Sequence, residues 1–129
     1  MILLLSTCKY RLSEEEFVRP IAVLVEEKWL DHEVRRYEEP VNPKGYSHVI
    51  ICGSALMDFE YLEHLDKFSW IKSFDGKILG ICSGYQVLAL LYGGRLKRNE
   101  KIGVKKVKVV KENPLAEGEF NAYFLHAYA

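Results

Sequence analysis

The segment Lys77–Gly94, KILGICSGYQVLALLYGG, constrains the fold of this chain more than any other. An apolar run delivers Cys82 between two glycines, Gly80 and Gly84, and an apolar helical pattern follows at once. A strand, a sharp turn and a helix in this order hold one side chain out above the edge of a sheet. Small residues flank the cysteine because such a strained turn leaves no room for neighbouring side chains. The segment therefore predicts a nucleophile elbow with Cys82 at its tip.

The helix expected directly after Cys82 bears on the chemistry of its thiol. The first N–H groups of a helix and its dipole stabilise negative charge, so we expect them to favour the thiolate. The same groups stabilise an oxyanion when a thiolate attacks a carbonyl carbon. The pattern indicates acyl transfer at cysteine, although a buried structural cysteine in a glycine-bearing turn fits residues 80–84 equally well.

The rest of the chain alternates short apolar strands with helical patterns. Strands are expected at residues 2–6, 33–37, 48–52, 77–81, 103–110 and 120–125, and helices at residues 13–30, 59–68 and 85–92. The first helix should begin at the capping box of residues 13–16, and Pro20 should bend it or delay its start. This alternation predicts an α/β three-layer sandwich, with a mostly parallel central sheet and helices on both faces. Active sites of such sheets lie beyond the carboxyl ends of the strands, where Cys82 is expected.

Composition sets the broad class of protein. At 129 residues, with 49% apolar and 28% charged residues and zero net charge, the chain fits one soluble domain over residues 1–129. No apolar run is long enough to span a membrane, and the apolar start of the chain lacks the basic region of a signal peptide. We therefore expect a cytoplasmic protein with no membrane contact. The three cysteines and four histidines show no ligand spacing, so we expect no disulfide, no metal and no cofactor.

Charge is distributed unevenly along the chain. Residues 14–39 hold nine acids and four bases, whereas residues 95–111 hold eight bases and one acid. A basic stretch binds nucleic acid or phosphate in some proteins. Here valines and lysines alternate at residues 106–109, which is typical of a half-buried strand with a solvated face. We expect no nucleic-acid partner, and docking of this face on an acidic partner protein is an alternative.

The residues around the cysteine resemble one known family. The run GICSGYQ, followed by Leu88-Ala89 and by Gly93-Gly94, is similar to the class I glutamine amidotransferases. In that family the elbow reads G-[IV]-C-x-G-x-Q, and a helix and a Gly-Gly turn follow it. The resemblance implies a flavodoxin-like α/β fold, L-glutamine as substrate, and a synthetase partner that uses the ammonia. It also implies that Cys82 attacks the glutamine side-chain amide, forming a thioester that water hydrolyses to glutamate.

The resemblance assigns an oxyanion hole. The loop after the third strand, residues 52–55, is similar to the family's glycine loop, so an N–H of Gly53 or Ser54 is implied as one donor. The one-residue alignment favours Ser54. The second implied donor is the N–H of Ser83. Taken alone, a glycine-serine pair is simply a common loop sequence.

Three further residues are implied as glutamine contacts. Gln86 matches the glutamine of the family motif, and on its own it would be a helix-surface residue. Glu100 lies in NEKIG, which resembles the family's E-x-G region beside the glutamine site. His126 ends a segment that resembles the one holding the substrate's α-carboxylate and amine, although a single histidine at a strand end is commonly a plain surface or core residue.

The family places its catalytic His and Glu in a late His-Pro-Glu segment, and residues 1–129 contain none. We expect that the native chain continues, that a partner protein completes the site, or that the protein is a relative without turnover. Two hypotheses follow: a glutaminase domain that supplies ammonia to a synthetase, and a catalytically incomplete binding or regulatory domain. A related class of cysteine hydrolases places His directly after the elbow cysteine. The presence of Ser83 there disfavours that class.

Overall fold

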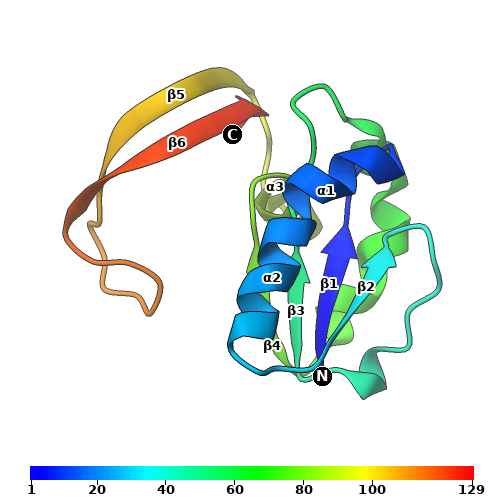
Figure 1. The fold of residues 1–129 in the computed structure, drawn as a ribbon. Helices are drawn as coiled ribbons and strands as arrows, with labels where there is room; N and C mark the ends of the chain where they lie inside the picture. Colours follow the sequence, from blue (N-terminus) through cyan, green and yellow to red (C-terminus); the bar gives the residue numbers. More distant parts are fainter. The chain divides into compact units, whose positions relative to one another are not determined.

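The computed structural model describes all residues 1–129 and divides them into two compact units, residues 1–96 and residues 97–129 (Figure 1). The first unit contains a parallel sheet with helices, and the second is a β-hairpin. None of the helices combines the length and apolar character that crossing a bilayer requires.

Four parallel strands form the sheet of the first unit, in the spatial order β2-β1-β3-β4. Their bounds are Ile2–Ser6 for β1, His32–Arg36 for β2, His48–Ile51 for β3 and Lys77–Gly80 for β4. At the centre of the register, Leu4 of β1 lies between Val34 of β2 and Ile50 of β3. Because the strands run parallel, their carboxyl ends meet at one edge of the sheet. The loops after β1 and β3 and the turn after β4 therefore come together.

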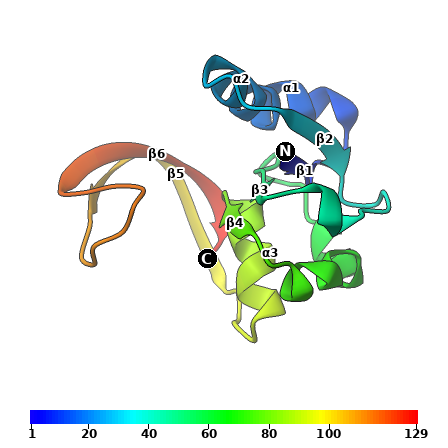
Figure 2. The ribbon, with the colours of Figure 1, turned by 90° about the horizontal axis from the view of Figure 1, so that it is seen from below.

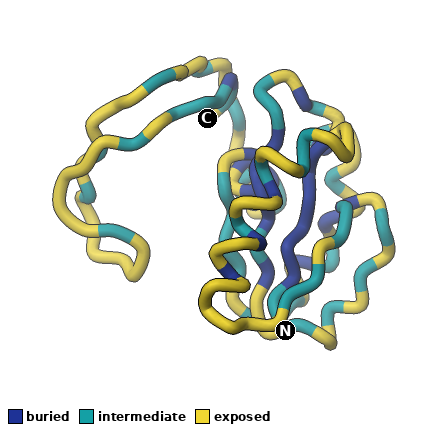
Figure 3. The backbone as a smooth tube through the Cα atoms, in the orientation of Figure 1, coloured by how far each residue is buried: buried dark blue, intermediate teal, exposed yellow.

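Helices cover both faces of this sheet, as the sequence predicted (Figure 2). The bounds are Glu14–Phe17 for α1, Arg19–Glu27 for α2, Ser83–Leu91 for α3 and Glu60–Ser73 for the 3-10 helix η3. Leu4 packs with Val18, Ala22 and Val25 on the α1–α2 face. Leu3 and Leu5 point the other way, into a core formed with Val49, Ile51, Tyr61, Phe68, Ile71 and Val87. Both faces of β1 are buried, which explains its unbroken apolar sequence (Figure 3).

The expected capping box at residues 13–16 is wrong. Ser13 has helical backbone angles, makes no side-chain capping bond, and ends a 3-10 turn, η1, at Arg11–Ser13. The single helix expected to residue 30 is two helices, because the backbone breaks at Val18. Pro20 lies in the first turn of α2, where its missing N–H removes no helical hydrogen bond. Of the two predicted effects of this proline, a bend or a delayed start, the structure shows an interruption, since helix already begins at Glu14 and a second helix begins beside Pro20.

The helix expected at residues 59–68 is instead the longer 3-10 segment η3, which is kinked at His64. Tyr61 on one side of the kink and Phe68 and Ile71 on the other are buried in the core. A short 3-10 helix at Pro43–Gly45, η2, precedes β3.

In the second unit, β5 at Arg98–Lys108 and β6 at Glu119–Tyr128 pair antiparallel, with Val104 opposite Tyr123. Both strands predicted in this region exist, and each is longer than expected. Val107 is half-buried while the neighbouring lysines are exposed, as the alternation predicted, but β5 ends before Val109, and Ile102 and Val104 of the same strand are exposed.

The close packing of Gly84 makes a prediction about stability. A Cβ at Gly84 would lie 2.2 Å from the carbonyl oxygen of Ile51, whereas a Cβ at Gly45 would have no atom within 4 Å. We expect Gly84→Ala to lower the free energy of unfolding by about 3 kcal/mol, since backbone must move, and Gly45→Ala to change it by less than about 0.5 kcal/mol. Urea denaturation measures both values. Equal denaturation midpoints for the two variants would contradict this packing.

Candidate active site

The turn between β4 and α3 has the geometry of an elbow. Strand β4 ends at Gly80, and α3 begins at Ser83, one residue after Cys82. Cys82 has φ 51° and ψ −104°, a conformation that side chains rarely adopt and that persists only when the surroundings hold it. The surroundings here are two close backbone approaches: a Cβ at Gly80 would lie 2.6 Å from the carbonyl carbon of Gly84, and a Cβ at Gly84 would lie 2.2 Å from the carbonyl oxygen of Ile51. The strand, turn and helix predicted from the glycine spacing are all present.

The thiol of Cys82 differs from the other two thiols of the chain. Cys82 is exposed, whereas Cys8 and Cys52 are fully buried. Partial desolvation by the surrounding protein nevertheless raises the pKa of the Cys82 thiol, and a hydrogen bond from the Ser83 N–H lowers it in part. The N–H at the helix start thus favours the thiolate, as expected, but desolvation has the larger effect and the pKa of the Cys82 thiol is raised overall.

The loop after β3 lies against the elbow. Gly53 and Ser54 are both buried, and a Cβ at Gly53 would be in ordinary contact with the Cβ of Cys82, at 3.5 Å. The backbone N–H groups of Gly53 and Ser54 donate to no group of the chain. The structure thus brings the predicted residues Cys82, Ser83, Gly53 and Ser54 to one edge of the sheet, with two N–H groups left available.

A buried pair of hydroxyls joins the three loops of this edge. Thr7 Oγ1 lies 2.7 Å from Ser83 Oγ and donates to the Cys52 carbonyl oxygen at 3.0 Å. Ser83 Oγ also lies within hydrogen-bond distance of that oxygen, at 3.1 Å. The sequence analysis missed Thr7. Its one available signal is that Thr7 directly follows the first strand, at the edge where Cys82 was expected.

Gln86 lies inside the protein and not on a helix surface. It is 5% exposed, and its side-chain oxygen accepts a hydrogen bond from the Tyr61 hydroxyl. Tyr61 is also buried and comes from η3, so this bond ties α3 to the neighbouring helix. The sequence analysis did not single out Tyr61. A contact between Gln86 and bound glutamine stays a prediction.

The remaining two predicted residues belong to the second unit, separate from the unit of Cys82. Glu100 is exposed and pairs with Arg98 at 2.9 Å. His126 lies opposite Lys101 in the hairpin register, with its ring edge-on to Phe124 at 5.9 Å, and its Nδ1 has no hydrogen-bond partner. The roles of Glu100 and His126 therefore stay predictions.

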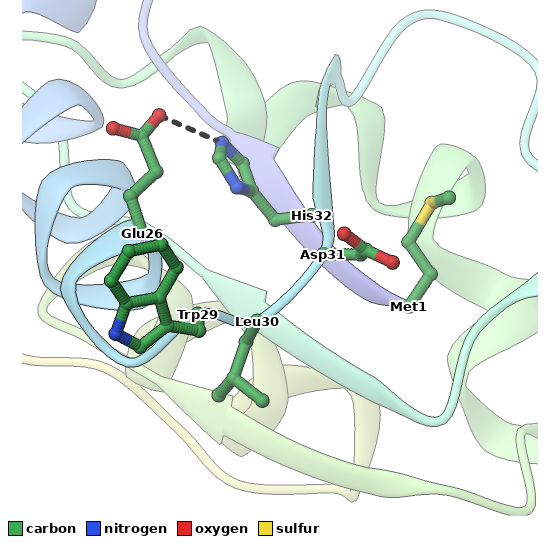
Figure 4. Close-up of a pocket in the computed structure, with 6 residues that line it drawn as sticks. All are labelled: Met1, Glu26, Trp29, Leu30, Asp31 and His32. Atoms are coloured by element: carbon green, nitrogen blue, oxygen red, sulfur yellow. Dashed lines mark ion pairs between the residues drawn. The ribbon is translucent and has the colours of Figure 1, made fainter.

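A shallow hollow lies away from this chemistry (Figure 4). It is lined by Met1, Glu26, Trp29, Leu30, Asp31 and His32, and an ion pair of 3.7 Å joins Glu26 to His32. Met1 and His32 lie at the amino ends of β1 and β2, so the hollow is at the sheet edge opposite Cys82. No group of three or more histidines, cysteines or acids in residues 1–129 is arranged to hold a metal ion.

The fold and the site define a known class of protein. The family described as glutamine amidotransferase class-I matches residues 14–129. The chain therefore belongs to the class-I glutamine amidotransferase family, which confirms the predicted resemblance.

Particular relatives are archaeal subunits of glutamine-hydrolyzing GMP synthase. The subunit of Methanocaldococcus jannaschii is 48% identical over 54 residues, which cover 38% of this chain and 29% of that protein. The subunit of Methanosarcina mazei is 38% identical over 53 residues, covering 40% of this chain and 28% of that protein. The matched segments thus span less than a third of these curated relatives.

Solved structures share the fold. A putative GMP synthase subunit of Thermoplasma acidophilum superposes with a TM-score of 0.79 at 20% identity, over 98% of this chain and 64% of that one. A glutamine amidotransferase of Thermotoga maritima gives a TM-score of 0.73 at 20% identity, over 99% of this chain and 61% of that one. The predicted parallel α/β fold is therefore confirmed.

The pKa of the thiol makes a prediction about pH dependence. Because only the thiolate is alkylated, we expect the rate of Cys82 alkylation by iodoacetamide to rise about tenfold per pH unit and to reach no plateau below about pH 9. Cys8 and Cys52 should stay unmodified in the folded protein, since both are buried and burial raises the pKa of Cys52 to about 12. Mass spectrometry of quenched samples measures the rate. A plateau below about pH 9 would contradict the raised pKa of this thiol.

Proposed function

We propose that this domain hydrolyses the side-chain amide of glutamine, with Cys82 as nucleophile, and delivers ammonia to a synthetase partner. The observation that supports this most strongly is the backbone of Cys82, held at φ 51° directly before α3 in a chain of this family. Strain of this kind persists at a residue whose side chain must be presented outward. The named relatives, which are subunits of a glutamine-hydrolyzing GMP synthase, support a synthetase as the ammonia acceptor.

The proposed reaction proceeds through a thioester. The Cys82 sulfur attacks the amide carbon, and the resulting oxyanion accepts hydrogen bonds from the Ser83 N–H and from the N–H of Gly53 or Ser54. When the intermediate collapses, the amide nitrogen leaves with the proton of the thiol as ammonia. Water then attacks the glutamyl thioester, which releases glutamate and restores the thiol.

The raised pKa of Cys82 shapes this proposal. A thiol with such a pKa is largely protonated at neutral pH, so its proton must be removed as the sulfur attacks. General acid–base help of this kind is worth roughly 10²–10⁴-fold in rate. The histidines His32 and His48 begin β2 and β3, at the edge of the sheet opposite Cys82. A test by turnover would depend on a group that accepts the thiol proton. We therefore choose covalent capture of the thiol, because capture requires only a binding pocket and some thiolate.

A second candidate function is glutamine binding without turnover, in a regulatory domain of the same fold. The positions of His32 and His48 at the amino ends of β2 and β3 favour it, since these histidines lie at the edge of the sheet opposite the thiol. This candidate keeps the oxyanion loop and the elbow as a binding surface. It differs from the first candidate in predicting no covalent chemistry at the thiol.

Covalent capture separates the two candidates. We expect a glutamine-like chloroketone to add once, at Cys82, at least about tenfold faster than a chloroketone lacking the amino-acid part, because binding places the carbonyl beside the sulfur. Free L-glutamine should slow the reaction. Intact-mass and peptide mass spectrometry locate the adduct.

Cys82→Ala is the matched control and should take up no reagent in the folded protein. An equal rate for both chloroketones, with no protection by glutamine, would reject the glutaminase proposal. Adducts on Cys82→Ala would place the reactive group elsewhere.

A further inference from the structure

Two buried hydroxyls converge on a single carbonyl oxygen beside the candidate active site. Thr7 and Ser83 are each 1% exposed, and both hydroxyl oxygens lie within 3.1 Å of the Cys52 oxygen. Their own separation, 2.7 Å, is typical of a good O–H···O bond. The three residues follow β1, β3 and β4, so the cluster joins all three segments that form the candidate site.

The hydroxyl groups of this cluster can satisfy one another's hydrogen bonds. A carbonyl oxygen accepts up to two hydrogen bonds, and each hydroxyl donates one and accepts others. Thr7 donates to Cys52 while Ser83 donates to Thr7, or the roles of the two hydroxyls are exchanged. In both arrangements every buried hydroxyl proton has an acceptor, so the cluster carries no unsatisfied donor.

The held carbonyl determines the direction of a neighbouring N–H. The Cys52 carbonyl and the Gly53 N–H belong to one planar trans peptide, so they point in opposite directions. Fixing the oxygen inside the protein therefore fixes the Gly53 N–H outward. The peptide between Gly53 and Ser54 is held in a similar way, because the Cys8 thiol contacts the Gly53 carbonyl oxygen at 3.6 Å. The Ser54 N–H of that peptide points in the direction opposite to this oxygen.

We propose that the side chains of Thr7 and Ser83 are positioning residues that orient the Gly53 N–H as an oxyanion donor beside Cys82. The inference rests on the proposed function and adds to it. Gly53 is close enough for this role, since a Cβ on it would contact the Cβ of Cys82 at 3.5 Å. The Gly53 N–H donates to no acceptor within the chain, so an internal hydrogen bond does not explain its orientation. The family alignment favours Ser54 as the loop donor, whereas the hydroxyl cluster acts on the peptide of Gly53.

The test compares two reagents on four proteins: wild type, Thr7→Ser, Thr7→Val, and Thr7→Val combined with Ser83→Ala. Addition of the thiolate to a glutamine-like chloroketone places negative charge on the ketone oxygen, whereas displacement of iodide from iodoacetamide does not. The ratio of the two rates at Cys82 therefore reports the oxyanion donors and cancels changes in thiol pKa. Thr7→Val keeps the shape of the side chain and removes its hydroxyl, and Thr7→Ser keeps the hydroxyl.

We expect the ratio to fall about tenfold in Thr7→Val and about 100-fold in the double variant, since loss of one oxyanion donor costs roughly 10²–10³-fold. Thr7→Ser should stay within about threefold of wild type, because its hydroxyl still reaches the Cys52 oxygen. A ratio within about twofold of wild type in both Thr7→Val and the double variant would overturn the proposal. If the double variant fails to fold, the rate ratio of Thr7→Val compared with that of Thr7→Ser tests the proposal.

A second measurement keeps this inference separate from the proposed function. In ¹⁵N–¹H spectra of the same proteins, the Gly53 amide peak should move in Thr7→Val and further in the double variant, while the peak of the distant Gly45 stays in place. Thr7→Ser should leave both peaks near their wild-type positions. If the wild type does not react with the chloroketone, the glutaminase proposal fails. The shift of the Gly53 peak then remains as the test of whether Thr7 and Ser83 orient the Gly53 N–H. An unmoved Gly53 peak in the double variant overturns the inference.

Discussion

The contact between the backbone of Gly84 and Ile51 underlies the rest of the candidate site. A Cβ at Gly84 would lie 2.2 Å from the Ile51 oxygen, which already accepts a hydrogen bond from the Ile81 N–H at 2.9 Å. Helix α3 can therefore start only where its first turn packs directly on β3. That packing forces Cys82 into its rare backbone conformation and places the Ser83 N–H at the sulfur. The same contact brings the loop after β3 beside the thiol.

The electrostatics of the site differ between the resting thiol and a developing oxyanion. Partial desolvation raises the pKa of the Cys82 thiol, and the hydrogen bond from the Ser83 N–H lowers it in part. The N–H groups of Gly53 and Ser54, in contrast, have no partner in the resting chain. Donors that gain a partner only when charge develops stabilise the transition state more than the ground state. In the proposed reaction, these two N–H groups would therefore act on the oxyanion intermediate more than on a resting thiolate.

Local patterns predicted the elements whose cause is local. The apolar run of β1 and the glycine spacing around Cys82 were enough to place the sheet and the elbow. The capping box failed because the 3-10 turn at Arg11–Ser13 runs directly into α1, so Ser13 has helical backbone angles and makes no capping bond. Thr7 was missed because its acceptor and its hydroxyl partner lie 45 and 76 positions along the chain. The effect of the helix start on the thiol pKa could be predicted because the helix start is visible in the sequence, whereas the larger effect of desolvation depends on the assembled loops.

The backbone strain at Cys82 has a consequence for the order of folding. Strained dihedrals persist only while the surrounding structure holds them, and here that structure is the pairing of β3 with β4 and the seating of α3 on Ile51. Both contacts join segments distant along the chain, and such contacts form late because loop closure must precede them. A newly made chain therefore carries three ordinary cysteines. The rare backbone conformation of Cys82 arises only when the sheet around it is complete.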